Sequence, residues 1–165
     1  MKRFIVVFVA LASLLLTSHR SSAAPLKACD FMNPQTASSV FGATVNAGRE
    51  ETVAEGAQQC VFDHDDPAAS GQIAFGLTDV NAMAASMGVS SAAIIPIIKQ
   101  SASGQKSETI PALGEWNCYS WNGLTDYTLA VLYHGKVLSL VSSGSKNPNL
   151  KAALTQAMRQ VMQKF

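Results

Sequence analysis

The stretch WNCYSWNGLTDYTLAVLYHGKVLSLVS, residues 116–142, decides the fold. Three runs rich in aromatic and β-branched residues, at 116–121, 124–133 and 136–142, are separated by Asn122-Gly123 and His134-Gly135. An Asn-Gly pair tolerates the positive φ angles of a two-residue hairpin turn, and His134-Gly135 suits a second short turn. The stretch therefore predicts a three-stranded antiparallel meander.

Two-residue turns fix the register of a hairpin, so each side chain can be assigned to a face. A turn at 122–123 sets Tyr119 opposite Asp126, and a turn at 134–135 sets Leu129 opposite Leu140. One face is then almost entirely apolar, and we assign it to the core beneath the C-terminal helix. This face carries Trp116, Cys118, Tyr127, Leu129, Val131, Tyr133, Leu138 and Leu140.

The opposite face of the meander is mixed and supplies the candidate binding residues, which are Asn117, Tyr119, Trp121, Asp126 and Thr128. Aromatic side chains beside an amide, a carboxylate and a hydroxyl are typical of ligand and protein interfaces. Two other interpretations stay open. The N-terminal helices could cover this face, or the rings could only stabilise cross-strand pairs.

The chain before the meander predicts both helices and strands. Asn33-Pro34 begins a short helix that Gly42 ends, since Asn suits the N-cap, Pro the first turn and Gly the C-terminal stop. Segments 58–63 and 72–77 read as strands that extend or flank the meander. Asp79 caps a further helix, and the helical piece from Ser90 or Ser91 should kink or break at Pro96.

After the meander, Asn147-Pro148 precedes a run to residue 165 whose apolar residues recur at helical spacing. The expected fold class is α+β, with a mostly antiparallel sheet packed by N-terminal, middle and C-terminal helices. We expect one such domain over residues 24–165, which is a usual domain length.

The first residues have the pattern of a secretory signal peptide, which we assign to 1–23. Lys2 and Arg3 precede an uncharged apolar run at 4–16, and small residues follow at 21–24. The apolar run is shorter than the roughly 20 residues of a membrane-spanning helix. Residues 26–29, LKAC, weakly match a lipoprotein signal, but Lys27 argues against it. We therefore expect a periplasmic or secreted protein without a lipid anchor at Cys29.

Composition narrows the class of partner. Loss of Lys2, Arg3 and Arg20 with the signal leaves nine of the 12 basic residues against 11 acidic ones. The exported chain then has no basic stripe, so we expect no nucleic-acid partner, and no later segment reads as a transmembrane span. The partner is expected to be a small molecule or another exported protein.

The sequence predicts no catalytic constellation, no metal site and no cofactor. No serine lies in a G-x-S-x-G motif. His64 lies among acidic residues in the stretch 63–66, which matches no calcium loop and reads as an acidic turn. Cys118 has no neighbouring Lys, Arg or His in the sequence to activate its thiol.

The three cysteines, Cys29, Cys60 and Cys118, all lie in the exported part of the chain. Oxidising compartments favour disulfides, and an odd count leaves one thiol over. We pair Cys29 with Cys60, which would tie the N-terminus to the sheet. Pairing of either one with Cys118 is the alternative.

Short ordered features resemble the small exported or lipid-anchored bacterial domains of unknown function that are abundant in actinobacteria. The features are CDFM at 29–32, VFG at 40–42, Cys60 before Phe62, and IPALGE at 110–115. The resemblance covers residues 29–165 and implies an α+β sandwich with a Cys29–Cys60 bridge. It implies no established enzyme activity.

These observations favour an exported, non-catalytic binding or protein-interaction module. A small periplasmic hydrolase that gathers Ser, His and Asp in space is one alternative, and an inhibitor or assembly factor of another exported protein is a second.

Overall fold

The computed structural model describes residues 26–64, 71–103, 106–121 and 125–165. The predicted signal peptide at 1–23, the turn at 122–123 and the acidic residues 65 and 66 lie outside this part of the chain. The helical elements are η1 (Ala28–Asp30), α1 (Pro34–Phe41), α2 (Val80–Ser86), α3 (Ser91–Ala102) and α4 (Leu150–Met162). The strands are β1 (Arg49–Ala54), β2 (Ala57–Asp63), β3 (Gln72–Asp79), β4 (Lys106–Glu108), β5 (Trp116–Trp121), β6 (Asp126–Tyr133) and β7 (Lys136–Ser143).

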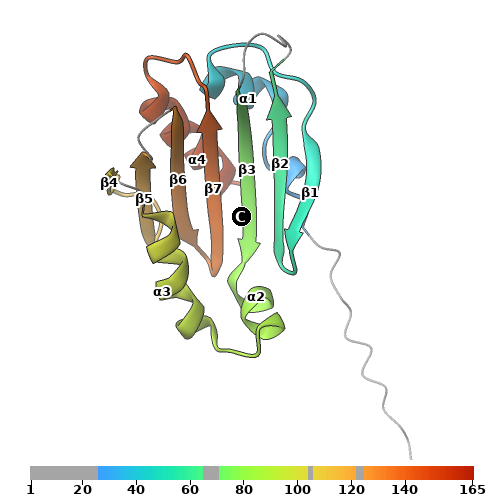
Figure 1. The fold of residues 1–165 in the computed structure, drawn as a ribbon, viewed down its shortest axis with the longest axis vertical. Helices are drawn as coiled ribbons and strands as arrows, with labels where there is room; N and C mark the ends of the chain where they lie inside the picture. The colour runs from blue at the N-terminus through green and yellow to red at the C-terminus, as the bar shows by residue number, and fades with distance from the viewer. Residues whose placement is uncertain (1–25, 65–70, 104–105, 122–124) are drawn as a thin grey trace, which may run out of the picture.

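The described strands form one antiparallel sheet in the order β1-β2-β3-β7-β6-β5-β4 (Figure 1). The β5–β6–β7 meander is one half of this sheet, and β3 joins it to β2 and β1 through its pairing with β7. The predicted α+β class, the meander and the two flanking strands are therefore confirmed.

Helices α1 and α4 cover one face of the sheet and enclose the main core, as Figure 1 shows. Leu129, Leu138 and Leu140 of the meander are fully buried there against Leu154 and Met158 of α4. The expected cover of the meander by the C-terminal helix is confirmed. At roughly 1.5–3 kcal/mol for each large apolar side chain, this burial is the main source of stability.

Local capping sets the limits of α1 and joins it to α4. The Asn33 side chain accepts a hydrogen bond from Thr36 N–H at 2.8 Å, and Gly42 ends the helix with a φ of 82°. The Asn147 amide then donates to the carbonyls of Ser39 and Val40 at the end of α1. One asparagine just before α4 thus satisfies carbonyls that the end of α1 leaves open.

The predicted register of the meander is confirmed between β6 and β7 and wrong between β5 and β6. Leu129 pairs with Leu140, as the His134-Gly135 turn requires, and both turn residues have positive φ. Tyr119, however, pairs with Leu129 and not with Asp126. The paired positions Trp121 and Tyr127 leave residues 122–126 between them, not the two residues expected.

This offset of three positions is odd, so it moves every β5 side chain to the opposite face. Trp116 and Cys118, which were assigned to the core face, lie on the other side of the sheet with Leu132 and Ala130 as their partners. Conversely, the side chains of Asn117, Tyr119 and Trp121 lie on the face that carries the main core.

A second, smaller core forms where α2 and α3 pack on the other face. It contains Val80, Ile94, Leu132 and Val137, with Trp116 against it. Of the kink or break expected at Pro96, the break is wrong, because α3 is assigned as one helix through this residue. The proline removes one helical hydrogen bond, whereas the buried Ile94 anchors the helix on this core.

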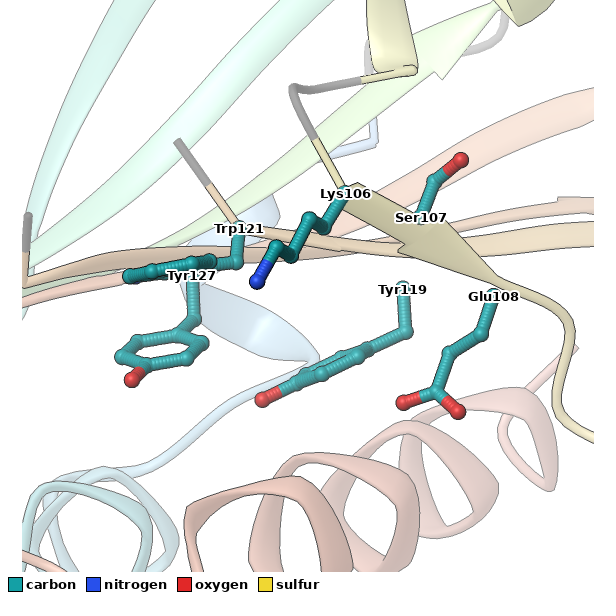
Figure 2. Close-up of a pocket in the computed structure, with 6 residues that line it drawn as sticks. All are labelled: Lys106, Ser107, Glu108, Tyr119, Trp121 and Tyr127. Carbon is teal, nitrogen blue, oxygen red and sulfur yellow. The ribbon is translucent and has the colours of Figure 1, made fainter. Parts of the chain in front are cut away.

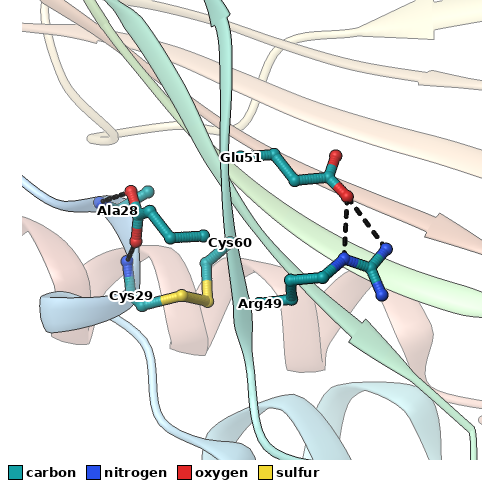
Figure 3. The surroundings of a disulfide bond; sticks show 6 residues. Ala28, Cys29, Arg49, Glu51 and Cys60 are labelled. Carbon is teal, nitrogen blue, oxygen red and sulfur yellow. Dashed lines mark hydrogen bonds and ion pairs between the residues drawn. A yellow bond between two sulfur atoms is a disulfide. The ribbon is translucent and has the colours of Figure 1, made fainter.

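The predicted disulfide joins Cys29 of η1 to Cys60 in β2 (Figure 3). The Glu50 carboxylate of β1 accepts hydrogen bonds from Ala28 N–H at 2.7 Å and Cys29 N–H at 2.8 Å. The N-terminal segment is therefore held to the sheet by a covalent bond and by a carboxylate at the start of η1. A disulfide fits an oxidising environment.

Among the described residues, no single helix has both the length and the hydropathy of a membrane span. Helices α2 and α3 meet the two criteria only as a pair, with a bend of 108° between them.

Candidate functional site

An open groove of about 440 Å³ lies beside the edge strand β4, on the face of the sheet that α1 and α4 cover. Lys106, Ser107 and Glu108 of β4, Tyr119 and Trp121 of β5, and Tyr127 of β6 line it (Figure 2). Its volume falls within the range of small-molecule pockets, about 300–1,000 Å³.

Cross-strand pairing brings the aromatic rings together. Trp121 pairs with Tyr127, and Tyr119 lies two residues before Trp121, so all three side chains leave the same face of the sheet. The rings of Tyr119 and Tyr127 are 6.1 Å apart between centroids, with 23° between their planes. Both tyrosines rest against the main core, while parts of their rings stay accessible. The result is a supported aromatic platform.

Two lysines approach the platform. The Lys106 ammonium lies 5.1 Å from the centre of the Trp121 ring, and Figure 2 shows its side chain extended toward that ring. The Lys151 ammonium of α4 lies 5.7 Å from the centre of the Tyr119 ring. Both distances are within the roughly 6 Å of a cation–π contact.

The carboxylate of the groove belongs to Glu108, and it is paired. Its oxygen lies 2.7 Å from the Lys151 ammonium, although both side chains are about half exposed. An exposed pair of this kind contributes little to stability. It does place α4 and the edge strand β4 in contact at one end of the groove.

Tyr119 is the titratable group whose environment is most altered at the site. Burial, together with the neighbouring Tyr127 and Glu108, raises the pKa of the Tyr119 hydroxyl to about 12. The hydroxyl therefore stays neutral near pH 7 and can both donate and accept a hydrogen bond.

Of the five residues predicted to form the binding face, only Tyr119 and Trp121 line the groove. Asn117 shares their face but is buried. Its side chain accepts from Ile110 N–H at 2.7 Å and donates to the carbonyls of Ile110 at 2.9 Å and Leu113 at 2.7 Å. The amide holds the segment that leads into β5.

Asp126 and Thr128 lie on the opposite face from the groove, because they flank the groove residue Tyr127 in β6 and successive side chains of a strand point to opposite faces. Asp126 accepts a hydrogen bond from the Ser143 hydroxyl, and Thr128 pairs with Ser120 and Val141. The predicted grouping of all five residues on one face is therefore wrong.

Sequence analysis missed five residues that form or border the groove: Lys106, Ser107, Glu108, Tyr127 and Lys151. Tyr127 was assigned to the core, and it does contact the core with part of its ring. Strand β4 is three residues long, and all three are exposed and polar or charged, so it has no apolar alternation to reveal it. Lys151 reaches the groove only through the packing of α4.

The two histidines that could take part in catalysis or metal binding lie far apart. His64 follows the end of β2, at the same end of the sheet as the last residues of β7, whereas His134 lies in the turn before β7. The eight residues of β7 separate them, or about 25 Å at a rise of roughly 3.3 Å per residue. These two histidines do not share a site.

The cysteines offer no reactive thiolate near the groove. Cys118 is free, buried and close to the Ala102 carbonyl of α3 on the opposite face. Cys29, Cys60 and Glu50 place three potential metal ligands within 4.8 Å of one another. The two sulfur atoms are joined as a disulfide, so they are not the thiolates that a metal requires.

Comparison of the chain with protein-family models, curated proteins and solved structures finds no significant match.

Proposed function

We propose that this chain is an exported, non-catalytic binding module whose ligand occupies the aromatic groove beside β4. The observation that carries the proposal is the gathering of Tyr119, Trp121 and Tyr127 around one open groove with charged groups at its rim.

The physical support lies in how the rings are held. Cross-strand pairing and contact with the main core fix Tyr119 and Tyr127 before any ligand arrives, so binding costs little side-chain entropy. Aromatic rings supply a large contact area, and their polar atoms can orient a ligand. Because Tyr119 stays protonated near pH 7 and Glu108 is ion-paired, these two groups suit recognition better than proton transfer.

Export to the periplasm or the cell exterior rests on the signal-like residues 1–23, and the disulfide is consistent with it. The Cys29 sulfur is bonded to Cys60, which argues against a lipid on that sulfur. Mass spectrometry of the exported protein tests this part. We expect a chain that begins at Ala24, carries one disulfide and has no added lipid mass.

Ligand-observed saturation-transfer NMR tests the binding site, with a panel of mono- and disaccharides, aromatic acids and amines as probes. Trp121→Ala removes one ring of the groove, and Trp116→Phe, on the opposite face, is the matched control. We expect at least one probe class to bind the unchanged protein and the Trp116→Phe variant and to lose its signal with Trp121→Ala.

Signals that are the same for all three proteins would place the bound probes elsewhere and contradict the proposal. So would a panel in which no probe class binds the unchanged protein.

A further inference from the structure

The charges around the groove do not cancel. Glu108 is neutralised by Lys151, whose ammonium is 2.7 Å away. Lys106 faces the Trp121 ring, and a ring contact does not neutralise its charge. Tyr119 adds no negative charge near pH 7, because burial raises its pKa to about 12. Among the residues that the structure describes, the groove therefore combines an aromatic platform with one positive charge, that of Lys106, for which no carboxylate partner is found.

From this balance, and resting on the proposed function, we infer that the groove binds small molecules that carry both a flat ring and a negative charge. The ring stacks on the Trp121–Tyr127 side of the platform, and the anionic group is held by the Lys106 ammonium.

A cationic ligand fits the same rings less well. The faces of Trp121 and Tyr119 are already approached by the ammonium groups of Lys106 and Lys151. A third cation at these rings meets like charge at close range, whereas an anion is attracted. A neutral ring gains the stacking contact alone. The expected order of affinity is anion, then neutral ring, then cation.

The size of the groove suits a small molecule. Its volume of about 440 Å³ is within the range of pockets that hold one small ligand, roughly 300–1,000 Å³.

Three probes that share an indole ring but differ in charge test the inference: indole-3-acetate (negative), indole-3-acetamide (neutral) and tryptamine (positive). Their dissociation constants for the purified protein are measured by NMR titration at low salt. We expect each step from anion to neutral to cation to weaken binding about fivefold, the effect of roughly 1 kcal/mol per unit charge at 4 Å in water. The steps shrink as salt is added.

Lys106→Gln should abolish the preference for the anion and leave the binding of indole-3-acetamide within about twofold. The matched control is Lys99→Gln, because Lys99 makes the same kind of contact, 5.6 Å from the centre of the Trp116 ring on the opposite face. This control should keep the full preference. Glu108→Gln should tighten indole-3-acetate binding, because it leaves Lys151 without its carboxylate.

The inference is overturned if tryptamine binds as tightly as indole-3-acetate, or if Lys106→Gln keeps the charge preference. It is also overturned if Lys99→Gln loses that preference to the same extent. If none of the three probes binds, the ligand class is wrong, while the broader panel of sugars, acids and amines still decides whether the groove is a binding site.

Discussion

Replacement of Asn117 by alanine should destabilise the protein strongly, although this residue first appeared to belong to an exposed binding face. Its side chain is 5 % exposed and makes three hydrogen bonds to backbone groups of Ile110 and Leu113, at 2.7, 2.9 and 2.7 Å. Both of those residues are also buried. Alanine would leave one N–H and two carbonyls without their partner.

The expected loss follows from these three contacts. A net hydrogen bond contributes roughly 1 kcal/mol, and a buried polar group left unsatisfied costs about 1–3 kcal/mol. Because water can reach some of the released groups after relaxation, we expect the free energy of unfolding to fall by about 3–4 kcal/mol. For a chain of this length, that is a decrease in Tm of about 10 °C.

Equilibrium urea denaturation followed by circular dichroism measures the change, with the m-value as a check on two-state behaviour. Asn149→Ala is the matched control, since Asn149 is exposed and its side chain makes no capping hydrogen bond. The control should change stability by less than about 0.5 kcal/mol. A loss below about 1 kcal/mol for Asn117→Ala would refute the assignment of a structural role.

Four further perturbations follow from the same structure. Tyr119→Ala should lower the free energy of unfolding by about 2 kcal/mol, because the ring packs on the core. Trp121→Ala should lower it by less than about 1 kcal/mol, because Trp121 lies at the partly exposed end of β5. Urea denaturation measures both changes. Replacing Cys29 and Cys60 together by serine should cost about 3–4 kcal/mol, since the bridge closes a separation of 31 residues. The pKa of Tyr119 rises from 10.0 to about 12 on folding. The contribution of this group to folding stability is therefore complete below pH 10 and is lost as the pH rises from 10 to 12. Tyr119→Phe should flatten the fall of Tm over that interval.

Each of these predictions has an outcome that contradicts it. A larger cost for Trp121→Ala than for Tyr119→Ala would show that the groove ring, not the core-facing ring, carries the packing. Equal stability with and without the bridge would show that Glu50 and the η1 contacts alone hold the N-terminal segment. If the Tm of Tyr119→Phe falls between pH 10 and 12 as steeply as that of the unchanged protein, the alkaline loss of stability comes from other groups.

The sequence determined those elements whose signals are local and unambiguous. Asn33 and Gly42 set the limits of α1, Asp79 caps α2, and the pair His134-Gly135 fixes β6 against β7. Each signal works within a few residues, because a cap or a two-residue turn satisfies backbone groups of its immediate neighbours.

The register of β5 could not be determined in this way. Both alternating sets of the strand contain one or more aromatic residues and a polar one: Trp116, Cys118 and Ser120 on one side, Asn117, Tyr119 and Trp121 on the other. Neither pattern marks the core face, so the assignment depended on the length of the connection before Asp126, and an odd error reverses it.

The sequence alone predicted an α+β chain with an antiparallel meander and a Cys29–Cys60 bridge as the preferred pairing, and the structure bears these out; the export signal at 1–23 remains a prediction. The tertiary structure decided the candidate site. Only pairing of β4 with β5 and packing of α4 on the sheet bring Lys106, Glu108 and Lys151 to the rings of Tyr119 and Trp121. The reason is physical: a groove between segments distant in sequence is made by long-range packing, and no local pattern of residues encodes it.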